Sequence, residues 1–122
     1  MKTVLVVDDS RIMRNIVKNT FSQLKIPCLF LEAENGKKAY QLLETNKVSL
    51  ILLDWNMPEM DGMEFLKKAR SMPDYENVPI IMVTSESAKY NVVEALQNGA
   101  TDYIVKPIRE KAFMEKLSEV LF

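Results

Sequence analysis

Five short, almost uninterrupted apolar runs divide this chain of 122 residues, and helical patterns separate them. Strands buried on both faces have this composition, because helices cover each side of a parallel sheet. The predicted strands are residues 4–7, 29–31, 50–53, 80–83 and 103–105. Five strands that alternate with five helices predict an α/β domain with a doubly wound parallel sheet and three layers.

Each segment between the runs carries apolar residues at helical spacing. Ser10 is the predicted N-cap of the first helix, and Asn98-Gly99 is a C-cap signal for the fourth. In the first helix the residues expected to face inward are Ile12, Met13, Ile16, Val17 and Phe21. In the other four they are Ala39, Leu42 and Leu43; Phe65, Leu66 and Ala69; Ala88, Val92, Ala95 and Leu96; and Phe113, Leu117, Val120 and Leu121.

The length predicts one domain over residues 1–122, with no output domain. The expected strand order is 2-1-3-4-5, a flavodoxin-like arrangement, although the pattern alone leaves close variants open. Net charge is −1 and the charged residues are scattered, which argues against nucleic-acid binding. No signal peptide or membrane span is visible, so a cytoplasmic location is expected.

Cysteine and histidine content narrows the chemistry further. Cys28 is the single cysteine, cannot form an internal disulfide and is expected inside the second strand. Histidine is absent, which excludes Ser/His and Cys/His catalytic pairs and any histidine-ligated metal.

Acidic residues end two of the predicted strands. Asp8 and Asp9 follow the first run, and Asp54 follows the third. Helix capping explains either site alone, but in the expected order the two strands are neighbours. Carboxylates about 4 Å apart repel by about 4 kcal/mol at an effective dielectric constant of about 20. Such a cluster requires a cation, and oxygen ligands without an EF-hand loop favour Mg²⁺ over Ca²⁺.

Thr84, Tyr103 and Lys106 lie at or just after the ends of the fourth and fifth runs, and so belong to the same sheet edge. Four segments then match a known family: Val-Asp-Asp-Ser at 7–10, Asp-Trp-Asn-Met-Pro-Glu-Met-Asp-Gly at 54–62, Val-Thr-Ser-Glu at 83–86 and Tyr-Ile-Val-Lys-Pro at 103–107. Over its whole length the chain resembles the receiver domain of two-component response regulators, and the stand-alone chemotaxis regulators most of all.

The resemblance implies a phosphoacceptor and a metal site. Asp54 would be phosphorylated to 4-aspartylphosphate by a histidine kinase. Asp9, Asp54 and the backbone carbonyl of Asn56 would bind Mg²⁺, with Asp8 acting through water or from the outer sphere. Lys106 would pair with the phosphoryl group, and the bond from Lys106 to Pro107 would be cis.

The resemblance also implies a switch. Thr84 would hydrogen-bond the phosphoryl oxygen, Tyr103 would change rotamer, and Asn56 and Glu86 would tune hydrolysis. The expected output face comprises the fourth helix, fifth strand and fifth helix, around Lys89, Tyr90, Asn91, Tyr103 and Lys106. The implied protein is a monomer that signals to a partner such as a flagellar motor switch component, and catalyses only its own phosphorylation and slow dephosphorylation.

Several alternatives stay open at this point. Within the family, the chain could be a phosphorelay intermediate or the detached receiver of a transcriptional regulator. A small phosphatase of the haloacid-dehalogenase type would also use an aspartate nucleophile. That class expects a second Asp two residues later, where this chain has Asn56. A flavodoxin-type carrier would need a Ser/Thr/Gly-rich loop after the first strand, where this chain has Asp8-Asp9.

Overall fold

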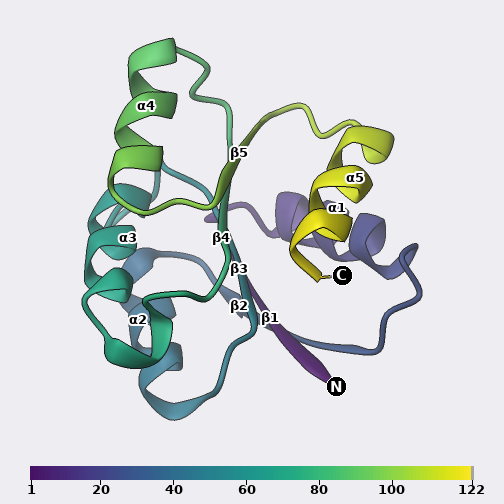
Figure 1. Ribbon diagram of the computed structural model, residues 1–122, viewed down its shortest axis with the longest axis horizontal. Helices are drawn as coiled ribbons and strands as arrows, with labels where there is room; N and C mark the ends of the chain where they lie inside the picture. Colours follow the sequence, from purple (N-terminus) through teal and green to yellow (C-terminus); the bar gives the residue numbers. More distant parts are fainter. Residues whose placement is uncertain (122) are drawn as a thin grey trace.

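A computed structural model describes residues 1–121 and contains a five-stranded parallel sheet with helices on both faces (Figure 1). The strands are β1 (Lys2–Val7), β2 (Cys28–Ala33), β3 (Leu50–Leu53), β4 (Ile80–Thr84) and β5 (Asp102–Val105). They are arranged in the order β2-β1-β3-β4-β5, which confirms the predicted topology. All four neighbouring pairs are parallel, so the carboxyl ends of the five strands share one edge.

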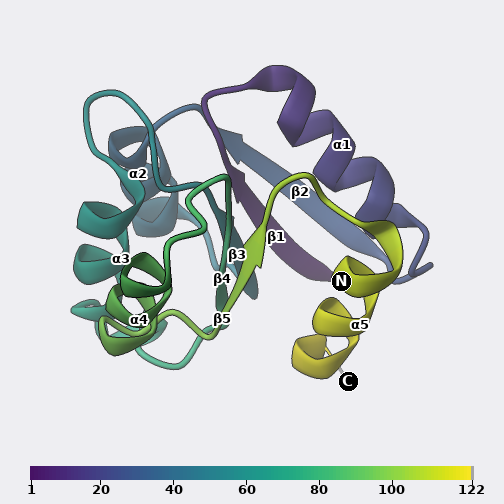
Figure 2. The ribbon, with the colours of Figure 1, turned by 90° about the horizontal axis from the view of Figure 1, so that it is seen from above.

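The helices form two layers. They are α1 (Arg11–Ser22), α2 (Gly36–Thr45), α3 (Gly62–Arg70), α4 (Lys89–Gln97) and α5 (Glu110–Leu121). Helices α1 and α5 cover one face of the sheet, and α2, α3 and α4 cover the other (Figure 2). A short 3-10 turn, η1 (Pro73–Tyr75), was not predicted. Phe122, the last residue of the predicted domain, lies outside the described residues.

The predicted helix boundaries at two ends are confirmed. Ser10 caps α1, because its hydroxyl oxygen accepts a hydrogen bond from the backbone N–H of Met13 at 3.2 Å. Gly99 follows α4 with a φ of 106°, a left-handed conformation that glycine adopts without steric penalty. Within residues 1–121, no helix is both long enough and apolar enough to cross a membrane.

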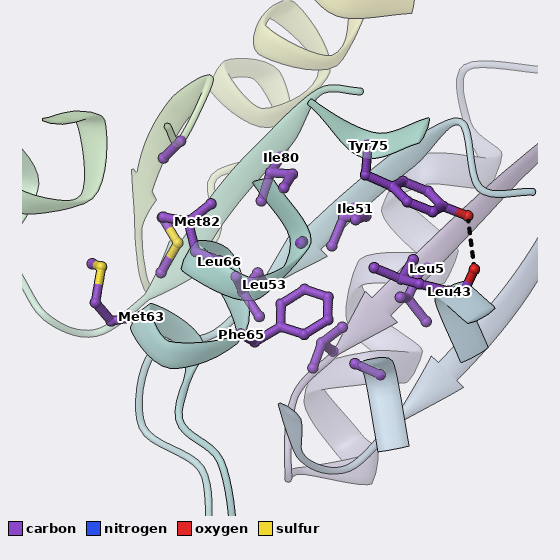
Figure 3. Packing of buried hydrophobic residues seen from close by; sticks show 14 of the residues in the cluster. Leu5, Leu43, Ile51, Leu53, Met63, Phe65, Leu66, Tyr75, Ile80 and Met82 are labelled. Atoms are coloured by element: carbon purple, nitrogen blue, oxygen red, sulfur yellow. Dashed lines mark hydrogen bonds between the residues drawn. The ribbon is translucent and has the colours of Figure 1, made fainter. Parts of the chain in front are cut away.

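Each face of the sheet has its own hydrophobic core. The core between the sheet and helices α1 and α5 contains Phe21, Phe113 and Leu117. The core between the sheet and helices α2, α3 and α4 contains Phe65 and Leu66. The second core ends at Tyr75, whose hydroxyl donates to the Leu43 carbonyl at 3.3 Å (Figure 3). The strands between these layers are fully buried in the centre of the sheet. The sheet is therefore a rigid base for the residues at its carboxyl edge.

Some predicted core residues are exposed. Ile12 and Ile16 are 73% and 41% exposed, since α1 packs through Val17 and Phe21, which lie about 100–180° away from them round the helix. Leu96 of α4 also faces outward, because the neighbouring Ala95 takes the buried position. Cys28 is half-buried rather than interior, because β2 is an edge strand.

Candidate functional site

Three carboxylates meet at the carboxyl edge of the sheet. Val7 is in register with Leu53, so Asp8 and Asp54, the next residues on β1 and β3, are side by side. One carboxylate oxygen from each of Asp8, Asp9 and Asp54 lies within 4.8 Å of the others. Asp8 and Asp54 are buried and Asp9 is exposed, so the cluster opens to solvent on one side.

Lys106 extends into this cluster from the loop after β5. Its ammonium is 2.8 Å from an Asp8 oxygen and 3.3 Å from an Asp54 oxygen. Its backbone N–H donates to the carbonyl of Thr84 at 2.8 Å, and the bond to Pro107 is cis, as predicted. The acids were expected to be uncompensated, whereas Lys106 neutralises part of their charge. Three carboxylates and one ammonium still leave an excess of two negative charges.

The ammonium remains charged in this setting. Burial acts to lower the pKa of Lys106, but the hydrogen bond to Asp8 and the charges of Asp54 and Asp8 together raise it. Lys106 is therefore protonated at neutral pH and presents a fixed positive charge beside Asp54.

Backbone N–H groups orient the two buried acids. One Asp54 oxygen accepts from the Trp55 N–H at 2.7 Å, and one Asp8 oxygen accepts from the Ser10 N–H at 2.9 Å. Because Ser10 provides the cap of α1, capping does not account for Asp9. Gly62 is needed below the site, since a Cβ there would collide with the backbone oxygen of Asp54.

Thr84 and Tyr103 flank the acids from β4 and β5. Thr84 is fully buried, and its hydroxyl oxygen is 3.4 Å from the Glu86 N–H. The Tyr103 side chain points inward, and its hydroxyl donates to the Glu86 carbonyl at 2.6 Å. Burial, with smaller contributions from the charges of Glu86 and Asp54, raises the pKa of Tyr103 to about 12. The phenol therefore stays protonated and remains a donor across the physiological range.

Asn56 and Glu86 are in direct contact. The Asn56 side-chain amide donates to one Glu86 carboxylate oxygen at 2.6 Å. The other oxygen accepts from the Asn91 amide of α4 at 3.3 Å. The structure thus brings together Asn56 and Glu86, which the sequence placed two residues beyond Asp54 and Thr84. It adds Asn91 as their connection to a helix.

Arg14 also supports the site, although it was not predicted from the sequence. Its guanidinium donates to the Asp8 backbone carbonyl at 2.6 Å and to Glu32 at 3.0 Å, which fixes the loop that carries the acids. Lys18 also pairs with Glu32 at 3.0 Å. The sequence signal that could have predicted these contacts is the spacing of Arg14 and Lys18, one turn apart on the helix after Asp8-Asp9, together with the acid Glu32 near the end of β2.

The donor set fits a hard divalent cation. One carboxylate oxygen from each of Asp8, Asp9 and Asp54 lies close enough to the others for a shared cation, and the exposed Asp9 leaves room for ligand waters. Mg²⁺ prefers such oxygen ligands and keeps several waters. The site can therefore bind a metal ion and, beside it, an anion that faces the Lys106 ammonium.

Comparison with known proteins identifies related sequences and folds. The response regulator receiver domain family matches residues 4–118. A chemotaxis protein CheY homolog of Campylobacter jejuni is 50% identical over 119 residues, covering 97% of this chain and 91% of that protein. Chemotaxis protein CheY1 of Helicobacter pylori is 47% identical over 97% of this chain and 95% of its own length. The structure of chemotaxis response regulator CheY4 of Vibrio cholerae superposes with a TM-score of 0.89, at 33% identity over 99% of both chains.

Proposed function

Because this chain belongs to the response regulator receiver domain family, we propose that it is a two-component signalling switch phosphorylated on Asp54. The observation that supports this most directly is the burial of Asp54 beside Asp8, with the Lys106 ammonium 3.3 Å from its carboxylate, at the edge where α/β folds place their sites. A histidine kinase is the proposed phosphodonor. The protein would act as a cytoplasmic monomer.

The chemistry follows from the neighbours of Asp54. A carboxylate oxygen of Asp54 attacks phosphorus, and the bond from phosphorus to the donor nitrogen breaks with its electron pair on the donor. Lys106 stabilises the negative charge that is spread over the transferring group. Asp9, Asp54 and the Asn56 carbonyl would hold Mg²⁺, with Asp8 in its outer sphere. The metal would supply further charge neutralisation at the phosphoryl oxygens.

Phosphorylation would then alter the contacts of Thr84 and Tyr103. A phosphoryl group adds about −1.5 to −2 charges, and a charged hydrogen bond to Thr84 is worth about 1.5–3 kcal/mol. Moving a switch from about 1:99 to 99:1 needs about 5.5 kcal/mol. Thr84 is therefore insufficient alone. Lys106, the metal and movement of Tyr103 away from Glu86 would provide the rest.

The proposed output face is α4, β5 and α5, with Lys89, Tyr90, Asn91, Tyr103 and Lys106 at its centre. It carries exposed apolar side chains on α4 and β5, among them Tyr90 at 75% exposure, Val93 and Val105. Apolar and aromatic side chains of this kind are suited to a protein partner. Since the relatives named above are chemotaxis proteins, we infer a role in chemotaxis, with a flagellar motor switch component as partner.

Other roles are less well supported. A phosphorelay intermediate or a receiver detached from a transcriptional regulator would use the same site and differ only in its partner. A phosphatase would need a general acid where Asn56 instead donates to Glu86. We therefore expect slow self-dephosphorylation and no turnover of phosphomonoesters. The flavin alternative would require the anionic loop at Asp8-Asp9 to accept a flavin phosphate, and the purified protein should be colourless.

The test uses the fluorescence of Trp55, whose backbone N–H donates a hydrogen bond to the Asp54 carboxylate. Its fluorescence should change on titration with Mg²⁺, and change again when a small acyl-phosphate donor is added. Asp54→Asn should abolish the second change, whereas Asp74→Asn, an exposed acid on η1, should leave it intact. No response in the natural chain, or an equal donor response in Asp54→Asn, would overturn the phosphoacceptor assignment.

A further inference from the structure

The carboxylate of Glu86 joins two elements through its two oxygens. One oxygen accepts from Asn56, two residues beyond Asp54, at 2.6 Å. The other accepts from Asn91, in the first turn of α4, at 3.3 Å. The three side chains therefore form a continuous chain of hydrogen bonds from the loop after β3 to α4. Neither end of this chain contacts Lys106 or the acidic cluster through a side-chain bond within residues 1–121.

The backbone of Glu86 is held as well. Its carbonyl accepts from the Tyr103 hydroxyl at 2.6 Å, and its N–H is 3.4 Å from the Thr84 hydroxyl oxygen. Both the main chain and the side chain of Glu86 are therefore hydrogen-bonded, which restricts where its carboxylate can lie. Within residues 1–121, Asn91 is the only residue of a helix whose side chain donates a hydrogen bond to Glu86.

Helix α4 begins without the usual side-chain cap. Its N-cap is Ala88, which has no polar side chain, whereas Ser10, Asn35 and Asp61 cap α1, α2 and α3. A helix end without a side-chain cap is weaker than a capped one, because one more backbone N–H of its first turn lacks a partner. The bond from Asn91 to Glu86 is thus a main polar tie between the first turn of α4 and the loop after β4.

We propose that Asn91 is a positioning residue that sets the lifetime of phosphorylated Asp54 by holding Glu86 against Asn56. This inference rests on the proposed function. Hydrolysis requires a water oxygen to bond to phosphorus while the bond from phosphorus to the Asp54 oxygen breaks. The electron pair returns to the carboxylate, and the water protons pass to phosphate and solvent.

The bonded pair of Asn56 and Glu86 spans the gap between the loop that carries Asp54 and the loop that follows Thr84. Held there by two amide donors, the Glu86 carboxylate cannot turn freely toward a water beside Asp54 to accept a proton from it. Loss of the Asn91 amide frees one oxygen and loosens the pair. Hydrolysis should therefore become faster, by about threefold to tenfold, when Asn91 is replaced.

The experiment measures the loss of phosphate from protein loaded with an acyl phosphate, after the donor is removed. Asn91→Ala should shorten the lifetime by about threefold to tenfold. Asn91→Asp, which keeps the shape but repels Glu86, should shorten it at least as much. Gln97→Ala, an exposed amide on the same helix, should leave it unchanged.

A double-mutant cycle separates positioning from a general effect on α4. In a Glu86→Ala background Asn91→Ala should have no further effect, because the group through which it acts is gone. Equal lifetimes in the natural chain and both Asn91 variants, or fully additive effects with Glu86→Ala, would overturn the inference alone. Failure of the natural chain to accept phosphate would overturn the proposed function along with it.

A second readout does not involve phosphate. The side-chain amide resonances of Asn56 in a ¹H–¹⁵N NMR spectrum should shift in Asn91→Ala and stay in place in Gln97→Ala. Unshifted Asn56 resonances in Asn91→Ala would show that α4 does not hold the pair, and would overturn the inference independently of any rate.

Discussion

Buried charge is held differently at the two ends of the sheet. At the amino end, the Arg70 guanidinium donates to the carbonyls of Gly99, Tyr75 and Val78 at 2.8, 2.7 and 2.6 Å. At the carboxyl end, Asp8 and Asp54 face one another across the Lys106 ammonium. At the amino end, neutral carbonyl groups satisfy the hydrogen-bonding needs of a cation. At the carboxyl end, several carboxylates share a single ammonium, so negative charge is in excess.

The difference separates stability from chemistry. Burial lowers the pKa of Arg70, yet an arginine remains charged and its carbonyl partners do not titrate. We expect these bonds to stay unchanged when a ligand or phosphoryl group binds at the opposite edge, because none of their members belongs to the acidic cluster. At the other end an added cation or a new anion on Asp54 alters every neighbouring interaction. We therefore expect substitutions at the amino end to affect folding and those at the carboxyl end to affect phosphorylation.

The largest expected effect is that of Lys106→Met on phosphoryl transfer. Loss of the ammonium that faces the transferring group should slow phosphorylation by an acyl phosphate about 10²- to 10³-fold. Stopped-flow Trp55 fluorescence on protein shown to be folded by circular dichroism would measure the rate. Lys116→Met, which removes the partner of Asp102, is the matched control and should leave the rate unchanged. A rate within about twofold of the natural chain would contradict the assigned role of Lys106.

Arg70→Met should act on stability instead. It leaves three carbonyl oxygens without their donor, so the free energy of unfolding should fall by about 2–4 kcal/mol. Urea unfolding measures this, with the exposed Lys67→Met on the same helix as a control. The phosphorylation rate of the folded variant should be unaltered. A slowed rate in folded Arg70→Met would break the separation between the two ends.

The smallest effect has the opposite sign. Asp9 lies near two other carboxylates, and its side chain makes no hydrogen bond to another residue of the range 1–121. Without Mg²⁺, Asp9→Asn should therefore raise the free energy of unfolding by up to about 1 kcal/mol, because repulsion is relieved in a partly solvated setting. The same variant should bind Mg²⁺ more weakly, as followed by Trp55 fluorescence. Unchanged Mg²⁺ affinity would exclude Asp9 as a ligand.

The sequence was sufficient for the fold because the strand signals are strong. Residues 50–53 were predicted with the observed bounds of β3, and the bounds of the other four strands differ from the prediction by at most two residues at either end. The inward-facing side of α1 was only partly right. Ile12 and Ile16 widen the apolar face of this helix on one side. The positions of apolar residues alone do not show which part of a wide apolar face contacts the sheet.

The meeting of Asp8, Asp9, Asp54 and Lys106 was also predictable, since parallel strands bring their carboxyl ends to one edge. Their roles in phosphorylation stay predictions. Arg14 and Arg70 were not predicted, and Asn91 was expected only on the output face and not as a partner of Glu86. Each of the three acts through a hydrogen bond to a loop whose path the sequence does not specify. Positions that depend on strand order could be inferred, whereas those that depend on loop conformation could not.

The hydrogen bond between Lys106 and Asp8 joins residues 98 positions apart. During synthesis on the ribosome, the acids emerge first and have no ammonium beside them until the loop after β5 has been made. A nascent or truncated chain that lacks Lys106 would carry the proposed phosphoacceptor in an incomplete setting. The proposed reactivity of Asp54 would then depend on a residue that is made long after Asp54 itself.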